Sequence, residues 1–176
     1  MEHPAPQTDE ELMLSVQGGD AGAYQELFHR HNRSVLGYLR RRVRDEEHAS
    51  DLFQETWLNV HRGAHTFKAN QRFRPWLFGI AVNTVRDSYR KQGRRIQTTE
   101  MVMEPGVPPR SNHPTRMTIE AAIDTLPEHL KQAFLLGAVQ GFNHREVAAQ
   151  LDISPDNARA RISRARSHLR KLLKPE

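Results

Sequence analysis

The sequence predicts an all-α protein made of two small helical domains joined by a flexible linker. Three observations support this fold class. Apolar residues recur at intervals of three and four along most of the chain, which is typical of helices that bury one face. No segment shows the alternation of a half-buried strand, and no Asn-Gly or Asp-Gly pair marks a hairpin. Between residues 97 and 115 the helical pattern stops in a stretch that contains four prolines.

We predict an N-terminal domain over residues 1–95 with three principal helices. Asp20 is a suitable N-cap for the first of them, whose apolar stripe is Tyr24, Leu27, Phe28, His31, Val35, Tyr38, Leu39 and Val43. The same spacing indicates a second helix through Leu52, Phe53, Thr56, Trp57 and Val60. It indicates a third through Trp76, Leu77, Ile80, Ala81 and Thr84 or Val85.

Residues 96–117 are predicted to form the linker, because proline blocks both helix continuation and strand pairing. The second domain is predicted over residues 118–176, and it contains a helix-turn-helix. Asn143 can cap a helix that ends near Leu151. Asp152 tolerates the left-handed backbone that the following turn requires. Ser154 can then cap a second helix, with Pro155 in its first turn.

The second helix of this motif is strongly basic. Its inner face is predicted to hold Ala158, Ile162, Ala165, Leu169 and Leu172 or Leu173. Seven cations follow Asp156, and no acidic residue stands between positions 157 and 174: Arg159, Arg161, Arg164, Arg166, Arg170, Lys171 and Lys174. Such a helix repels itself unless an anion neutralises it, and arginine binds phosphates and guanine edges through two parallel hydrogen bonds. The pattern therefore predicts a DNA recognition helix.

Composition narrows the function classes. The formal net charge is +5, which favours a polyanionic partner. The chain has no cysteine, no secretory signal and no apolar run of membrane-spanning length, so we expect a cytoplasmic protein without membrane insertion. We predict no catalytic residue, no cofactor and no small-molecule substrate, because nucleophile triads and phosphate-binding loops are missing. His61 and His65 have chelating spacing, but without further ligands we predict no metal site.

Several segments resemble one known family. The runs DLFQETWLNV and RPWLFGIAVNTVRDSYRKQGRR are similar to regions 2.2 and 2.3–2.4 of extracytoplasmic-function (ECF) sigma factors, members of the sigma-70 family. The runs LPEHLKQAFLL, GFNHREVAAQL and SPDNARARISRARSHLRKLL are similar to their region 4. The resemblance extends from about Leu12 to Leu173, in the family's order. It implies a subunit that binds core RNA polymerase and directs it to promoter DNA.

The resemblance implies a role for each segment. Polymerase would bind Asp51, Gln54, Glu55, Trp57 and Leu58, with Phe53 and Trp57 also anchoring the core. A loop over residues 65–73 and the helix after it would hold a base flipped from the −10 element, through Phe67, Lys68, Asn70, Arg72, Asn83, Arg86, Arg90 and Lys91. Phe67 and Phe73 could either stack or pack, and Trp76 is expected in the core.

The recognition helix would read the −35 element through Asn157, Arg159, Ala160, Arg161, Ser163, Arg164 and Arg166. Arg159 and Arg161 are expected at base edges because they lie near the helix N-terminus. This helix departs from the family's usual Thr-Val-Lys-Ser-Arg by reading Asn157-Ala158-Arg159-Ala160-Arg161. The −35 sequence of relatives therefore does not transfer to this chain.

Three interpretations follow from the sequence. The leading one is a promoter-specificity subunit that an anti-sigma factor holds inactive until a signal arrives. The second is a stand-alone helix-turn-helix regulator, which would bind duplex DNA by itself, usually as a dimer. The third is an interaction module with a basic tail that does not read DNA. A nucleic-acid enzyme ranks last because no candidate nucleophile or metal site is visible.

Overall fold

The computed structural model describes residues 7–43, 45–98 and 118–173, without the side chains of 94–98. Over these residues the secondary structure is helical, with turns between helices and no strand. The chain divides into two compact units. The all-α prediction with two helical domains is therefore confirmed. Most of the predicted linker, residues 99–117, lies outside the described residues.

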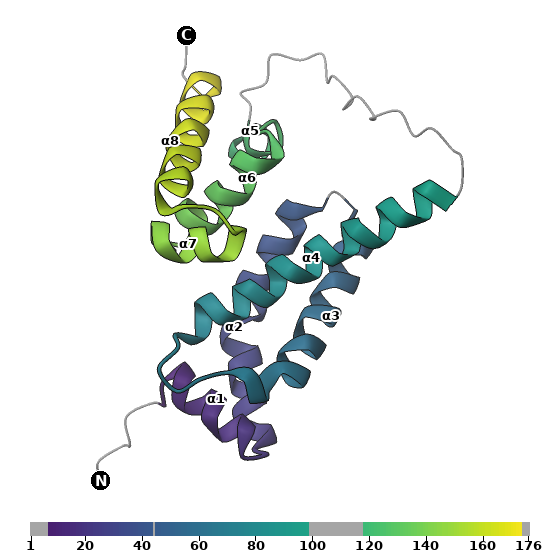
Figure 1. The fold of residues 1–176 in the computed structure, drawn as a ribbon, viewed down its shortest axis with the longest axis vertical. Helices are drawn as coiled ribbons and strands as arrows, with labels where there is room; N and C mark the ends of the chain where they lie inside the picture. The colour runs from purple at the N-terminus through teal and green to yellow at the C-terminus, as the bar shows by residue number, and fades with distance from the viewer. Residues whose placement is uncertain (1–6, 44, 99–117, 174–176) are drawn as a thin grey trace. The chain divides into compact units, whose positions relative to one another are not determined.

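The N-terminal unit is built on four helices. They are α1 (Asp9–Gln17), α2 (Ala21–Arg42), α3 (Glu46–Gly63) and the first half of α4 (Phe73–Thr98). A short 3₁₀ turn, η1 (Ala64–Thr66), follows α3 directly. In Figure 1, α1 lies at the end of the bundle where α2 begins and α3 ends, and it contacts both α2 and η1.

Side-chain caps fix where these helices begin. Thr8 and Glu11 form a reciprocal capping box at the start of α1. Asp20 accepts hydrogen bonds from the backbone of Gly22 and Ala23, as predicted for the start of α2. Asp45 caps α3 in the same way, through the backbone of Glu47 and His48. Each cap satisfies N–H groups that lack an intrahelical partner.

The predicted stripes form the core of this unit. Leu27, Val35, Tyr38, Leu39, Leu52, Val60, Leu77 and Val85 are almost wholly buried. Tyr38 of α2 meets Phe78 of α4 edge to face at 5.6 Å between ring centroids. On another side of α2, Phe28 packs on Trp57 of α3 at 4.9 Å. Aromatic contacts thus fasten α3 and α4 to the long central helix.

The C-terminal unit contains α5 (Ile119–Asp124), α6 (Glu128–Phe134), a π-helical turn η2 (Leu135–Val139), α7 (His144–Leu151) and α8 (Pro155–Leu172). α8 packs on α5 and α6. Gly137 lies against α8 so closely that a Cβ there would overlap the side chain of Ile162. The buried Lys131 is neutralised by Asp124, whose Oδ1 lies 2.7 Å from Nζ.

The helix-turn-helix forms as the sequence predicts. Asn143 accepts hydrogen bonds from the backbone of Arg145 and Glu146 and so caps α7. Asp152 has a φ of 55°, the left-handed conformation expected for the turn. The Ser154 side chain accepts from the backbone of Asn157 at the start of α8. Ala158, Ile162, Ala165 and Leu169 are buried, as predicted.

Three details differ from the sequence predictions. Helix α1 was not expected, although it buries Leu12 and Met13. Helix α4 continues to Thr98, into the stretch assigned to the linker. Leu172 and Leu173, expected on the inner face of α8, are exposed because the helix ends there beyond its packing partners, α5 and α6.

Candidate polymerase and nucleic-acid interfaces

One face of α3 is exposed, and it carries the residues expected to bind polymerase. Asp51 and Gln54 are exposed, Glu55 is half-buried, and Leu58 exposes 53% of its surface. Leu58 gives this face an apolar contact area and the three residues around it give polar groups, a composition with which a helix can dock on a partner. Asp51 and Leu58 each lie three or four residues from both Gln54 and Glu55, so the four side chains share one side of the helix.

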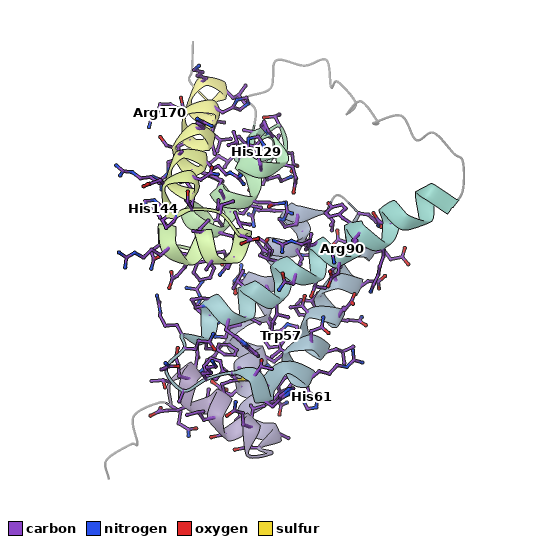
Figure 2. All side chains as sticks on the ribbon, in the orientation of Figure 1. Trp57, His61, Arg90, His129, His144 and Arg170 are labelled. Atoms are coloured by element: carbon purple, nitrogen blue, oxygen red, sulfur yellow. The ribbon has the colours of Figure 1, made fainter. Side chains whose placement is uncertain are left out.

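Trp57 has a different place from its neighbours. Only 4% of it is exposed, and its ring contacts Tyr24, Phe28 and Phe53. The Tyr24 hydroxyl also donates to the Trp57 carbonyl at 2.8 Å, and burial raises the pKa of that hydroxyl. Trp57 therefore anchors α3, and a direct contact with polymerase is not favoured by this arrangement. Figure 2 shows Trp57 and His61 one turn apart on α3.

The 65–73 loop combines an aromatic base with exposed polar residues. Phe67 and Phe73 are buried and contact each other and the half-buried Trp76, at centroid distances of 5.4 to 6.2 Å. Packing is thus the role that the structure favours for both phenylalanines, and the predicted DNA contact of Phe67 is revised. Between the two phenylalanines in the sequence, Lys68, Asn70 and Arg72 are exposed.

The middle of α4 carries further exposed polar residues. Asn83, Arg86, Arg90 and Lys91 are all exposed and lie on one side of the helix. Behind them, Thr84 accepts a hydrogen bond from Asn59 of α3 at 3.3 Å and donates to the Ile80 carbonyl at 2.9 Å. Arg90, labelled in Figure 2, lies 3.6 Å from Asp87. The α4 face can therefore present an amide and three cations to a polyanion.

Sequence reasoning missed two contributors from α1. The Gln17 side chain donates to the carbonyls of Ala64 and Phe67, both at 2.8 Å. Glu10 accepts from the backbone N–H of Phe73 at 2.9 Å. The capping-box pattern of Thr8 and Glu11 could have indicated the helix. No local pattern could have indicated contacts that join residues 47 to 63 positions apart.

In the C-terminal unit, α8 exposes most of the predicted DNA-contacting residues. Asn157, Arg159, Ser163, Arg164 and Arg166 are exposed, while Ala160 and Arg161 are half-buried. The Arg161 Nε donates to Asn157 Oδ1 at 3.1 Å, so these two residues hold each other in place. Arg159 and Asn157 lie in the first turns of the helix, the part that enters a major groove in this motif.

A hollow of about 350 Å³ opens where α7 and α8 begin. It is lined by Asn143, His144, Arg145, Pro155, Asp156 and Arg159. His144 and Arg145 were not singled out from the sequence. Figure 2 labels His144 at the start of α7 and Arg170 near the end of α8.

Two histidines of the N-terminal unit contact other side chains. His31 is buried against Asp9, and His61 packs edge to face on Tyr24 at 5.5 Å. Among the described residues, no group of three or more His, Asp or Glu side chains could hold a metal ion. Nor does any helix in the described parts of the chain have the length and apolar character needed to span a membrane.

Two family models match the chain. Sigma-70 region 2 matches residues 27–95, and Sigma-70 region 4 matches residues 116–169. RNA polymerase sigma factor CarQ of Myxococcus xanthus is 35% identical over 92% of this chain and 95% of its own. The chain belongs to the sigma-70 family of RNA polymerase sigma factors.

Further relatives place this sigma factor in the ECF group. The ECF RNA polymerase sigma-E factor of Haemophilus influenzae is 30% identical over 96% of both chains. RNA polymerase sigma-H factor of Pseudomonas aeruginosa is 29% identical over 95% of this chain and 94% of its own. These relatives favour the sigma-factor interpretation over the stand-alone regulator.

Solved structures agree with this assignment. The chain is similar to CnrH, solved in complex with the cytosolic domain of CnrY, with a TM-score of 0.70 and 26% identity over 94% of this chain and 96% of that one. The sigma factor RpoE of Bartonella quintana has the same fold, with a TM-score of 0.71 and 22% identity over 87% of this chain and 98% of its own.

Proposed function

We propose that this sigma factor divides promoter recognition between its two helical units. The N-terminal unit docks on core polymerase and captures the −10 element, and the C-terminal unit reads the −35 element. The observation that carries this proposal is the placement of the exposed residues. Most residues predicted to contact polymerase, the −10 element or the −35 element are exposed, and each set lies on one face of a helix or loop that is packed against the core. A few members of these sets are buried or half-buried.

Polymerase docking is assigned to the exposed face of α3. Leu58 supplies apolar area that is costly to leave in water, and Asp51, Gln54 and Glu55 supply polar contacts around it. The buried Trp57 holds this face rigid against α2. Burial of Leu58 by a partner then contributes to binding free energy without an entropic cost for ordering the helix.

Capture of the −10 element is assigned to Lys68, Asn70 and Arg72 of the loop and to Asn83, Arg86, Arg90 and Lys91 of α4. An exposed asparagine offers both a donor and an acceptor to the pairing edge of a flipped base. The cations follow the phosphate backbone of the separated strand. The buried aromatic cluster of Phe67, Phe73 and Trp76 supports the loop from below.

Recognition of the −35 element is assigned to α8. Asn157, Arg159 and Arg161 lie where a recognition helix reaches base edges, and Arg161 is oriented by its hydrogen bond to Asn157. Ala160, Ser163, Arg164 and Arg166 flank them, and the arginines neutralise phosphates. Because phosphate contacts carry no sequence information, promoter choice depends most on Arg159 and Arg161.

The sigma factor acts in the cytoplasm, where polymerase is, and has no catalytic activity, cofactor or small-molecule substrate of its own. A partner protein with the role of an anti-sigma factor controls it. The similar chain CnrH was solved bound to the cytosolic domain of a second protein, which supports this mode of control. Covering α8 or the exposed face of α3 would be sufficient to block initiation.

Run-off transcription with core polymerase tests this proposal. Genomic fragments, including the region upstream of the protein's own gene, serve as templates. We expect discrete transcripts that require the protein and that fall sharply with Asn83→Ala or Arg159→Ala. Binding of duplex DNA by the free protein, without core binding or initiation, would instead support the stand-alone regulator. Failure in both assays would support the interaction module.

A further inference from the structure

We propose that α1 sets the conformation of the 65–73 loop, and that Gln17 and Glu10 are positioning residues for capture of the −10 element. This inference rests on the proposed role of the loop in binding that element. Neither residue belongs to the predicted DNA-contacting set. Both act through hydrogen bonds to backbone groups at the two ends of the loop.

Gln17 holds the start of the loop. Its Nε2 donates to the carbonyl oxygens of Ala64 and Phe67, each at 2.8 Å. An amide NH₂ group has two hydrogens, so one glutamine can bind both carbonyls at once. The two carbonyls lie three residues apart, where the chain leaves α3 through η1. Gln17 therefore fixes the backbone conformation at the start of the loop.

Glu10 holds the end of the loop. Its Oε1 accepts a hydrogen bond from the Phe73 N–H at 2.9 Å, and Phe73 is the first residue of α4. The first N–H groups of a helix have no intrahelical acceptor, and a carboxylate there is favoured by the helix dipole. Glu10 thus acts as a cap supplied from a different helix, and it fixes where α4 begins.

Helix α1 is itself fastened to α2, so its hold on the loop is rigid. Asp9 Oδ2 lies 2.6 Å from Nε2 of the buried His31, and Asp9 Oδ1 lies 3.0 Å from the Arg30 guanidinium. Leu12 and Met13 are buried beneath α1. The loop is therefore tied, through one short helix, to the core of the N-terminal unit.

The part of the loop between the Gln17 and Glu10 hydrogen bonds carries the exposed residues Lys68, Asn70 and Arg72. Gln71 N–H donates to the Lys68 carbonyl at 2.9 Å and closes a turn that contains Asn70. This bond lies within the loop and does not join it to the helices. A loop that is already ordered in the free protein loses little conformational entropy when it binds DNA. Release of either end should therefore weaken DNA binding without removing any DNA contact.

The test measures binding of a fluorescent single-stranded oligonucleotide by the holoenzyme. The probe is the non-template −10 strand of a promoter found by run-off transcription, with a scrambled strand as control. We expect Gln17→Ala to weaken binding at least roughly fivefold, as for the loss of two hydrogen bonds. Gln17→Glu should be at least as harmful, because a carboxylate cannot donate to the carbonyls.

Glu10 provides a rescue within the same experiment. Glu10→Ala should weaken binding, whereas Glu10→Gln should restore most of it because the amide oxygen still accepts from Phe73. Gln25→Glu, on an exposed position of α2, is the matched control for the charge added by Gln17→Glu. Core affinity and urea unfolding followed by tryptophan fluorescence show whether each variant stays folded and assembled.

The outcomes separate this inference from the proposed function. If Asn70→Ala weakens binding but Gln17→Ala and Glu10→Ala do not, the positioning role is wrong and the loop's role stands. If Asn70→Ala also has no effect, both are wrong. Loss of oligonucleotide binding that only parallels unfolding or loss of core affinity would likewise overturn the positioning role.

Discussion

Asp9 Oδ2 lies 2.6 Å from His31 Nε2, and this contact joins α1 to α2 in the N-terminal unit. His31 is 7% exposed, and its ring also packs on Phe73, with centroids 5.3 Å apart. Asp9 binds Arg30 as well. Hydrogen bonds to Glu26 and then to Asp9 raise the pKa of the Arg30 guanidinium, which stays charged.

Asp9→Ala should therefore destabilise the N-terminal unit by about 1–3 kcal/mol, the cost of leaving a buried polar group without its partner. Both tryptophans, Trp57 and Trp76, belong to this unit, so urea unfolding followed by fluorescence reports on it alone. Glu26→Ala is the control, since it removes only the exposed pair with Arg30 and should cost at most about 0.5 kcal/mol. Equal effects of the two changes would refute a special role for Asp9.

Because the Tyr24 hydroxyl is partly buried, we expect the stability of the N-terminal unit to fall at alkaline pH. The pKa of this hydroxyl is raised above the ordinary value by burial, so the folded state disfavours ionisation. Its contribution to stability is complete below about pH 10, the ordinary tyrosine value, and is lost as the pH rises through the raised pKa. Tyr24→Phe should cost about 0.5–1.5 kcal/mol at neutral pH through loss of the bond to the Trp57 carbonyl.

Urea unfolding of both proteins at neutral pH and above about pH 10 checks the sign. The gap in the free energy of unfolding between wild type and Tyr24→Phe should narrow at the higher pH. A gap that stays constant or widens would show that this hydroxyl does not resist ionisation in the folded state.

Gly137 should be intolerant of a methyl group. A Cβ there would overlap Cδ1 of Ile162, which is 3% exposed and has little room to move. Gly137→Ala is expected to destabilise the C-terminal unit by about 1–3 kcal/mol through overpacking. Ile162→Val removes Cδ1, so the double variant should recover part of the loss in thermal unfolding followed by circular dichroism. Purely additive effects of the two changes would exclude the steric explanation.

Substitutions at Leu58 and Leu52 distinguish a role of α3 in polymerase docking from its role in folding. Leu58 is 53% exposed, whereas Leu52 is 2% exposed. Leu58→Ala should weaken core-polymerase binding about tenfold with little change in stability. Leu52→Ala should cost about 2–5 kcal/mol of folding free energy. Fluorescence anisotropy with core enzyme measures the first effect, and an unchanged affinity for Leu58→Ala would remove α3 as the docking face.

Local patterns predicted much of this fold. The apolar stripes of α2, α3, α4 and α8 and the caps at Asp20, Asn143 and Ser154 lie where the sequence placed them. These features depend on residues within one or two turns of each other. The candidate site residues came from the family resemblance, whereas the periodicity predicted only that positions opposite a buried stripe remain at the surface.

The remaining features depend on contacts between distant residues. Helix α1 is only nine residues long, and its role depends on Gln17 reaching carbonyls 47 and 50 positions away. The burial of Phe67 depends on the ring of Trp76 across the loop. The close approach of Gly137, in the π-helical turn at Leu135–Val139, to Ile162 of α8 joins positions 25 residues apart. Neither composition nor spacing encodes these relationships.

Position-specific crosslinking in the holoenzyme tests the central claim most directly. A photoreactive amino acid replaces Lys68 in the loop or Arg159 in α8, and the crosslinked bases are mapped on a promoter defined by run-off transcription. The account predicts that position 68 crosslinks the non-template strand of the −10 element and position 159 crosslinks the −35 element. Crosslinks from both positions to the same element, or from position 68 to duplex DNA outside the −10 element, would contradict it.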